Sequence, residues 1–366
     1  MRVLHVLDEL RASGGEVMLR DAIEPLRAHG VEVIVLSTGQ RVGDFASEYQ
    51  RLGVEILHLP FERHARFAAR FHRLARTAGV DVIHIHTERA NAVLGFAARL
   101  AGRRTIRTVH NVFAYAGRLR TIRTVERAML RTIGVRHVSI GASVEHNERL
   151  RLRNTTDRVD NWIGAQFRPP DDDERDASRR HYDLAADVIA ITTIGNCSRV
   201  KNHVAVLKAL PHVARALERR VVYLHAGSGA DEDDERALAR SIQTGDVEAR
   251  FLGTVSDVRP LLWASDVYCM PSLYEGLGIA ALEALACGVP SVLADVDGLR
   301  DVHPPSVSVR FVEPVAADVA AGVTQLLADA SAARSPAREA AETVRRSRSV
   351  ERRVAQLVTL YGSRRP

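Results

Sequence analysis

The feature that most constrains the fold is an alternation of short apolar segments with longer amphipathic ones along the 366 residues. Short apolar runs predict buried strands, and apolar residues spaced three to four apart predict helices. Strands interleaved with helices predict parallel sheets with right-handed crossovers. The predicted strands of the first half are RVLHVL, VEVIVLS, VEILHL, DVIHIHT, RTIRTVH and VRHVSI. Those of the second half are DVIAITTIG, RRVVYLHAG, ARFLGTV, DVYCMPS and PSVLADV.

The chain is too long for one ordinary core, and its strands fall into two sets. We therefore predict an α/β protein with two doubly wound domains, residues 1–165 and 166–345. A final amphipathic helix within 346–366 is expected to pack back on the N-terminal domain. The boundary between the two predicted domains falls near a polar, acidic segment, PPDDDERDASRRHYD. This composition predicts a linker or an exposed loop.

Composition indicates the cellular compartment in which the protein works. The three cysteines form no C-x-x-C pair, which favours a reduced compartment. The first apolar run is short and has no basic segment before it, so it predicts a strand and not a signal peptide. No run of about 18 apolar residues occurs, so no membrane span is predicted. We expect a cytoplasmic protein.

The net charge of +6 is unevenly spread. Residues 1–165 hold 26 basic and 17 acidic residues, a net +9, and the remainder carries −3. Residues 117–137 form an arginine-rich helix candidate. The favoured interpretation is a solvated basic face; the alternative is peripheral docking on an anionic membrane, at its inner face, or on an anionic acceptor. No aromatic-interleaved basic motif accompanies the charge, so nucleic acid is not an expected partner.

Two loops have the character of phosphate sites. Ser13-Gly14-Gly15 follows the first strand and precedes a helix, where glycines let a phosphate approach the backbone. It is not G-x-G-x-x-G, which argues against a dinucleotide dehydrogenase. In GNCSRVKNH, Arg199 and Lys201 precede a helix, and two cations at a helix N-terminus suit a diphosphate. Only two of the 51 basic residues are lysines, which makes Lys201 conspicuous.

Two glutamates lie in the segment PSLYEGLGIAALEALACGVP, residues 271–290. Glu275 falls in a strand-to-helix loop, at the strand end where doubly wound sheets bind ligands. Glu283 falls in a helix that is otherwise apolar and therefore buried, where an ionised carboxylate needs a hydrogen-bonding partner. The residues alone leave two interpretations open, a ligand-binding pair and a buried structural pair.

Taken together, these segments resemble the retaining glycosyltransferases of family 4, the glycosyl transferases group 1. The resemblance covers the glycine turn, DVIHIHT, TVHN, GNCSRVKNH and the stretch from FLGTVSDV to CGVPSV, with the E-x7-E spacing as its hallmark. It implies the GT-B fold, two Rossmann-like domains facing a central cleft. It also implies retaining transfer of a hexose-type sugar from a nucleoside diphosphate sugar, UDP favoured over GDP, to a small-molecule or lipid-linked acceptor on the N-terminal domain.

The resemblance implies two sets of site residues. The catalytic set is His110, Glu275, Lys201 and Arg199. The donor-binding set is Gly14, Gly15, Asn196, Gly276, Leu277, Gly278 and Glu283. In the family pattern, the match to Glu283 holds ribose hydroxyls, the match to Glu275 contacts the transferred sugar, and the match to Lys201 neutralises the leaving diphosphate. The family often has arginine where this chain has Asn196, and we expect Arg199 to supply that guanidinium.

No metal and no other cofactor is expected. Asp295-x-Asp297 lies late in the second half, outside the context of a metal-chelating D-x-D. His84 and His86 share one face of a strand, as half a metal site would, but no further ligand cluster is apparent near them, so strand burial is favoured. Two alternative functions stay open, a nucleotide-sugar epimerase of the same fold and a non-catalytic nucleotide-sugar-binding protein. The acceptor also stays open among glycolipids, polysaccharide intermediates, thiol precursors and antibiotic aglycones.

Overall fold

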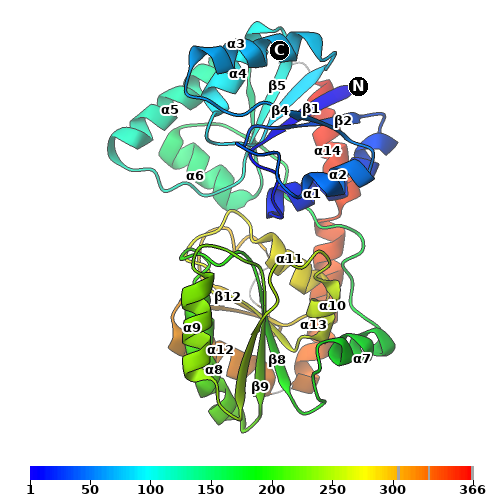
Figure 1. The fold of residues 1–366 in the computed structure, drawn as a ribbon, viewed down its shortest axis with the longest axis vertical. Coiled ribbons are helices and arrows are strands. Elements are labelled where there is room, and N and C mark those ends of the chain that lie inside the picture. The colour runs from blue at the N-terminus through cyan, green and yellow to red at the C-terminus, as the bar shows by residue number, and fades with distance from the viewer. Residues whose placement is uncertain (303–305, 329, 364–366) are drawn as a thin grey trace. The chain divides into compact units, whose positions relative to one another are not determined.

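The computed structural model describes residues 1–302, 306–328 and 330–363, and the chain divides into two compact units. The first unit comprises Met1–Gly164 with Arg348–Pro366, and the second comprises Ala165–Ser347. Each unit is built on one parallel sheet with helices on both faces (Figure 1). The predicted α/β class with two doubly wound, Rossmann-like sheets is confirmed.

Within the described residues, the first unit has a seven-stranded sheet in the order β3-β2-β1-β4-β5-β6-β7. Its strands are β1 (Arg2–Leu7), β2 (Glu32–Ser37), β3 (Glu55–His58), β4 (Val82–Ile85), β5 (Arg104–Val109), β6 (Arg136–Ser139) and β7 (Asp157–Arg158). Its helices are α1 (Gly14–Ala28), α2 (Ala46–Arg51), α3 (Ala65–Thr77), α4 (Asn91–Leu100), α5 (Gly117–Thr132), α6 (Ala142–Leu152) and α14 (Val350–Gly362).

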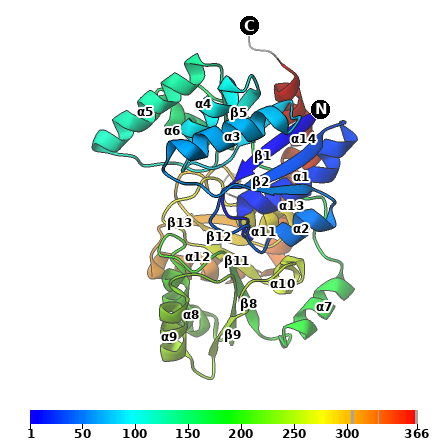
Figure 2. The ribbon, with the colours of Figure 1, turned by 45° about the horizontal axis from the view of Figure 1, so that its top comes forward.

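The sheet of the first unit is buried on both faces, which explains why its strands are continuous apolar runs. On one face, side chains of β1, β2 and β4 pack with Phe67 and Phe71 of α3 and with Leu94 of α4. On the other face, the C-terminal helix α14 lies beside α1 (Figures 1 and 2). Tyr361 of α14 is fully buried, and its hydroxyl is 2.8 Å from Nδ1 of His84 on β4.

The second unit has a six-stranded sheet in the order β10-β9-β8-β11-β12-β13, counted over the described residues. Its strands are β8 (Ile189–Ile194), β9 (Val221–Ala226), β10 (Val247–Phe251), β11 (Val267–Met270), β12 (Ser291–Ala294) and β13 (Val309–Val312). Its helices are α7 (Asp172–His181), α8 (His203–Leu217), α9 (Glu232–Ile242), α10 (Arg259–Ala264), α11 (Ile279–Ala286), α12 (Ala316–Ala328) and α13 (Ala330–Ser347).

Successive residues of β8 point to opposite faces of this sheet and enter separate cores. Ile189 and Ile191 pack with α8, α9 and α12, whereas Ala190 packs with side chains of α10. Figure 1 shows α8, α9 and α12 on one side of the sheet and α10, α11 and α13 on the other. Both faces of the second sheet are therefore covered by helices.

Three details differ from the sequence prediction. The polar segment at the domain boundary, which was predicted to be a linker or loop, forms helix α7. A capping box starts that helix, because the Asp171 side chain accepts from the Glu174 amide while the Glu174 carboxylate accepts from the Asp171 amide. The arginine-rich helix α5 ends at Thr132, and the rest of the predicted segment leads into β6. Strands β7 and β13 were not predicted.

In the part of the chain that the structure describes, no helix combines the length and the apolar character needed to cross a bilayer.

Candidate active site

The predicted donor-site loops of the second unit meet at one point of its sheet. β8 and β11 are neighbours in the sheet, and the strand order reverses between them. Such a topological switch point is where doubly wound sheets bind ligands, beyond the carboxyl ends of the strands. The loop after β8, residues 195–202, contacts the loop after β11, residues 271–278, because the Leu273 amide donates to the Val200 carbonyl oxygen at 2.8 Å. Asn202 adds a second link by donating from Nδ2 to the Pro271 carbonyl oxygen at 3.1 Å.

The contact between these loops brings Lys201 and Glu275 together. Nζ of Lys201 lies 2.5 Å from Oε1 of Glu275, although the residues are 74 positions apart in the chain. The same carboxylate oxygen accepts a hydrogen bond from Ser272 Oγ at 2.9 Å. Both side chains are partly exposed, 23% for Lys201 and 13% for Glu275. A cation and an anion are therefore held side by side where a ligand can still reach them.

The turn that carries Glu275 is shaped by glycines. Gly278 has a φ of 65° at the N-cap of α11, a left-handed conformation that favours glycine. Gly298, with a φ of 86°, lies against the turn so closely that a Cβ there would be 2.4 Å from the Glu275 carbonyl oxygen. Gly276 and Leu277 are buried between them. The main chain of the turn is thus fixed from two sides.

Glu283 is buried on α11, as its apolar surroundings in the sequence predicted. Its charge acts together with that of Glu275 on one buried phenol: burial first, and then the charges of Glu275 and Glu283, raise the pKa of Tyr268 on β11 well above its ordinary value. Both carboxylates are therefore close enough to Tyr268 for their charges to act on it. Tyr268 was not singled out in the sequence, because it sits inside an ordinary apolar strand.

The remaining loop residues differ in exposure and partners. Asn196 and Arg199 are both exposed, and within the described residues Arg199 has no hydrogen-bond or ion-pair partner. The glycines after β9 bring a second loop against this one. A Cβ on Gly227 would be 1.9 Å from the Gly195 carbonyl oxygen, and one on Gly229 would be 2.3 Å from that of Cys197. That this second loop, residues 226–231 (AGSGAD), packs against the loop of residues 195–202 was not apparent from the sequence.

In the first unit, Gly14 and Gly15 begin helix α1 after β1, and a Cβ on Gly15 would meet nothing within 4 Å. His110 follows β5 and belongs to a chain of histidines: its Nε2 is 2.9 Å from Nδ1 of His86, whose Nε2 is 3.0 Å from Nδ1 of His5. Burial, with the nearby charge of Arg107, lowers the pKa of His110 to about 4. His110 is therefore a neutral imidazole at neutral pH.

The view that no further ligand lies near His84 and His86 is wrong. His5 of β1 places a third imidazole nitrogen within 4.8 Å of ligand atoms of both. The sequence hid this because His5 is some 80 residues away and reaches them only through the pairing of β1 with β4. Asp295 and Asp297 are both paired with Arg300 on the protein surface.

Two family profiles match the chain. The family described as Glycosyl transferases group 1 matches residues 174–343, and the Glycosyl transferase 4-like domain matches residues 13–162. The chain belongs to the group 1 glycosyl transferase family. It is therefore a glycosyltransferase, as predicted from the sequence, and the roles of individual residues are a separate question.

Individual relatives agree with this assignment. EpsF of Bacillus subtilis is 26% identical over 318 residues, which cover 80% of this chain and 79% of EpsF. The UDP-Gal:alpha-D-GlcNAc-diphosphoundecaprenol alpha-1,3-galactosyltransferase of Escherichia coli is 23% identical over 237 residues, 62% of this chain and 61% of that enzyme. The crystal structure of Anabaena HepE in complex with UDP-glucose has a TM-score of 0.83 at 17% identity, covering 98% of this chain and 100% of HepE. That structural likeness shows the shared GT-B fold.

Proposed function

We propose that this glycosyltransferase moves a hexose from a UDP-sugar, with retention of configuration, to an acceptor bound by the first unit. The observation that carries the proposal is the pairing of Lys201 with Glu275 at the switch point of the second unit, in the segment of residues 271–290 that also holds the buried Glu283. A nucleotide sugar needs a cation for its diphosphate and acceptors for its hydroxyls, and this point supplies both.

In this proposal, Glu283 accepts hydrogen bonds from the ribose hydroxyls and Glu275 from the transferred sugar. Lys201 binds the diphosphate, and the exposed Arg199 adds the guanidinium that Asn196 lacks. In the second unit, the backbone of Gly276, Leu277 and Gly278 in the turn of residues 275–278, which we call the donor turn, completes the site. The family resemblance also assigns donor contacts to Gly14, Gly15 and the neutral His110 of the first unit.

The ion pair between Lys201 and Glu275 suggests how the reaction is organised. When a diphosphate arrives, it competes for Lys201 and leaves the Glu275 carboxylate free to accept from sugar hydroxyls. As the glycosidic C–O bond to the phosphate breaks, Lys201 and Arg199 stabilise the charge that develops on the leaving diphosphate. The acceptor oxygen attacks the same face of the sugar, and its proton passes to the departing phosphate oxygen. These cations do the electrostatic work that a bound metal does in other sites.

The choice of uridine and of a lipid-linked acceptor rests on the relatives. HepE binds UDP-glucose in its crystal structure, and the Escherichia coli enzyme takes UDP-galactose to a diphosphoundecaprenol-linked sugar, as its name states. We propose that the present chain likewise takes its acceptor from a lipid surface.

Helix α5 offers a surface suited to that contact. Leu119, Ile122, Val125 and Met129 are 47%, 44%, 51% and 47% exposed and follow one another at helical spacing. We call these four residues the α5 apolar stripe. Arginines of the same helix flank the stripe, and an apolar face bordered by arginine is typical of helices that lie on anionic membranes. This exposed stripe favours membrane docking over the purely solvated face that charge alone suggested.

Replacing the two glutamates one at a time tests the site. In Glu283→Gln, a charged hydrogen bond to ribose is lost, which is worth about 1.5–3 kcal/mol and lowers UDP affinity roughly tenfold to a hundredfold. In Glu275→Gln, turnover should fall instead, because its interaction with the sugar strengthens in the transition state. Free UDP should bind this variant as well as before or more tightly, since Lys201 loses its competing partner. Calorimetry with UDP and kinetics with labelled UDP-glucose measure both.

Glu339→Gln, on the exposed side of α13, is the matched control and should change neither property. The residue assignment fails if Glu275→Gln abolishes UDP binding while Glu283→Gln leaves it intact. Appearance of an epimerised donor in the absence of acceptor would contradict the proposed transfer and support the epimerase alternative.

A further inference from the structure

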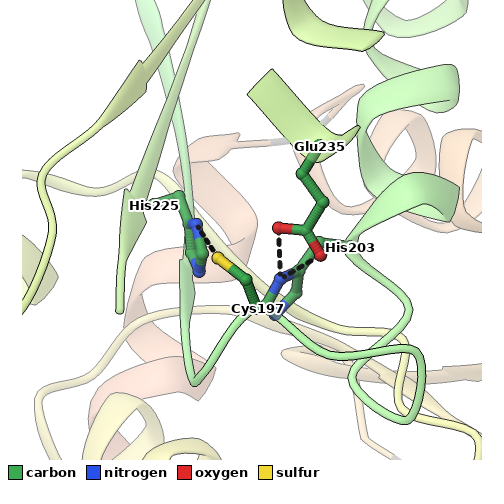
Figure 3. Close-up of side chains that lie close together, drawn as sticks. All are labelled: Cys197, His203, His225 and Glu235. Carbon is green, nitrogen blue, oxygen red and sulfur yellow. Dashed lines mark hydrogen bonds and ion pairs between the residues drawn. The ribbon is translucent and has the colours of Figure 1, made fainter. Parts of the chain in front are cut away.

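Four metal-ligating side chains converge at a buried point of the second unit (Figure 3). They are Cys197 in the loop after β8, His203 at the start of α8, His225 on β9 and Glu235 on α9. One ligand atom of each lies within 4.8 Å of those of the other three, and all four residues are buried. None of them has a part in the proposed sugar transfer.

Two separations within the cluster are close to those of a tetrahedral zinc site. Cys197 Sγ lies 3.7 Å from His225 Nδ1, and His203 Nδ1 lies 3.1 Å from the nearer oxygen of Glu235. With Zn–S near 2.3 Å and Zn–N or Zn–O near 2.0–2.1 Å, a tetrahedron has edges of about 3.6 Å between sulfur and nitrogen and about 3.3 Å between nitrogen and oxygen. The two separations differ from these edges by about 0.1 and 0.2 Å, and every other separation within the set is at most 4.8 Å.

A second contact orients one of the imidazoles as a ligand. His225 Nε2 lies 3.0 Å from the Gly195 carbonyl oxygen, so this nitrogen carries the proton and donates it. Nδ1 then presents its lone pair toward Cys197. Metal-bound histidines commonly donate their other ring N–H to a carbonyl or carboxylate in this manner.

The histidine cluster of the first unit, formed by His5, His84 and His86, differs in the partners of its ring nitrogens. Both ring nitrogens of His84 are occupied by hydroxyl groups outside the cluster, Tyr361 at 2.8 Å and Thr108 at 2.7 Å. An ion there would have to displace one of these partners. In the second unit, by contrast, the contacts of Cys197 with His225 and of His203 with Glu235 join members of the cluster to one another.

We propose that Cys197, His203, His225 and Glu235 bind one Zn²⁺ ion as a closed structural site. A thiolate, two imidazoles and a carboxylate form a ligand set that suits zinc, and four protein ligands leave no open position for a substrate. On binding, the Cys197 thiol gives up its proton to solvent and Sγ coordinates as thiolate. The ion ties the loop of residues 195–202 to β9 and α9. Because that loop also carries Arg199 and Lys201, zinc holds the proposed diphosphate site in place.

Metal content is the direct test, and it does not depend on the sugar-transfer proposal. The full chain, expressed without an affinity tag and purified without chelator, should contain about one zinc ion per molecule by elemental analysis. Cys197→Ala and His225→Ala should lose it, whereas Cys269→Ala, at another buried cysteine on β11, should keep it. Adding Zn²⁺ to metal-stripped protein should raise its melting temperature, because the ion binds only the native site.

Cobalt substitution supplies a readout that needs no variant. Cobalt-loaded wild-type protein should show the intense visible bands of tetrahedral Co²⁺ and a thiolate-to-cobalt charge-transfer band, which Cys269→Ala retains. Should Cys197→Ala fail to fold, this spectrum still decides. The proposal is overturned if purified protein holds less than about a tenth of a zinc ion and added Zn²⁺ does not stabilise it. It is equally overturned if Cys197→Ala folds and retains the metal.

Discussion

Substituting Gly298 by alanine tests whether the donor turn must keep its position. The substitution has two separable costs. The left-handed φ of 86° costs any residue with a Cβ about 1–2 kcal/mol. In addition, the new Cβ would lie 2.4 Å from the Glu275 carbonyl oxygen and 2.8 Å from that of Gly276, whereas ordinary contact begins at 3.4 Å. The turn must therefore move by about 1 Å, and such a misplacement near the chemistry costs roughly a hundredfold in rate.

Gly102→Ala is the matched control for the backbone cost. Gly102 has a φ of 74° in the turn between α4 and β5, and a Cβ there meets nothing within 4 Å. Both variants should lose a few degrees of melting temperature, but only Gly298→Ala should lose about a hundredfold in kcat/KM with labelled UDP-glucose. Equal activity in the two variants would show that this turn does not position the reacting sugar.

Four further outcomes are expected. Lys201→Met should weaken UDP binding at least tenfold by calorimetry, because a charge-assisted hydrogen bond to phosphate is lost, while Lys208→Met, at the only other lysine, should not. The free energy of unfolding, measured in urea, should fall as the pH drops from about 6.5 toward 4. Burial lowers the pKa of His5 to about 3 and that of His110 to about 4, whereas histidines of the unfolded chain take up protons from about pH 6.5 downward. His110→Gln should reduce that slope; an unchanged slope would assign it to other groups. The protein should sediment with anionic liposomes and detach as salt rises, and equal binding to neutral liposomes would count against the α5 apolar stripe as an electrostatic docking face. Turnover should not increase when magnesium or manganese is added, and a requirement for either would contradict the cationic role of the loop after β8.

The sequence predicted the sheets because parallel, buried strands leave an unmistakable pattern of apolar runs. It also predicted that Glu283 is buried, since the helix around it is apolar on every side. It missed α7 although the capping-box pattern Asp171-x-x-Glu174 was present, because the high charge of the segment was taken as a sign of a loop. Charge on a helix that packs by one face says little about whether the helix forms.

The contacts that depend on strand order could not be predicted from the sequence. Lys201 meets Glu275 only because β8 and β11 are neighbours, and no local pattern records which strands pair. The proposed zinc site could not be predicted for the same reason. Cys197 and His203 are six residues apart, but His225 and Glu235 join them through β9 and α9, at spacings that match no familiar zinc motif.

The pairing of Lys201 with Glu275 also gives the two residues a shared role in the proposed site. A cation kept alone for a diphosphate would repel Arg199 on the same loop, and without Lys201 the Glu275 carboxylate would keep only the Ser272 hydroxyl as a donor. Paired, each satisfies the other, and because the pair is partly exposed its net stabilisation is only about 1 kcal/mol or less. A diphosphate, with more than one negative charge and several acceptor oxygens, can outcompete one carboxylate at that cost. Donor binding then converts the satisfied pair into two separate groups, one at the phosphates and one at the sugar, at the moment when both are needed.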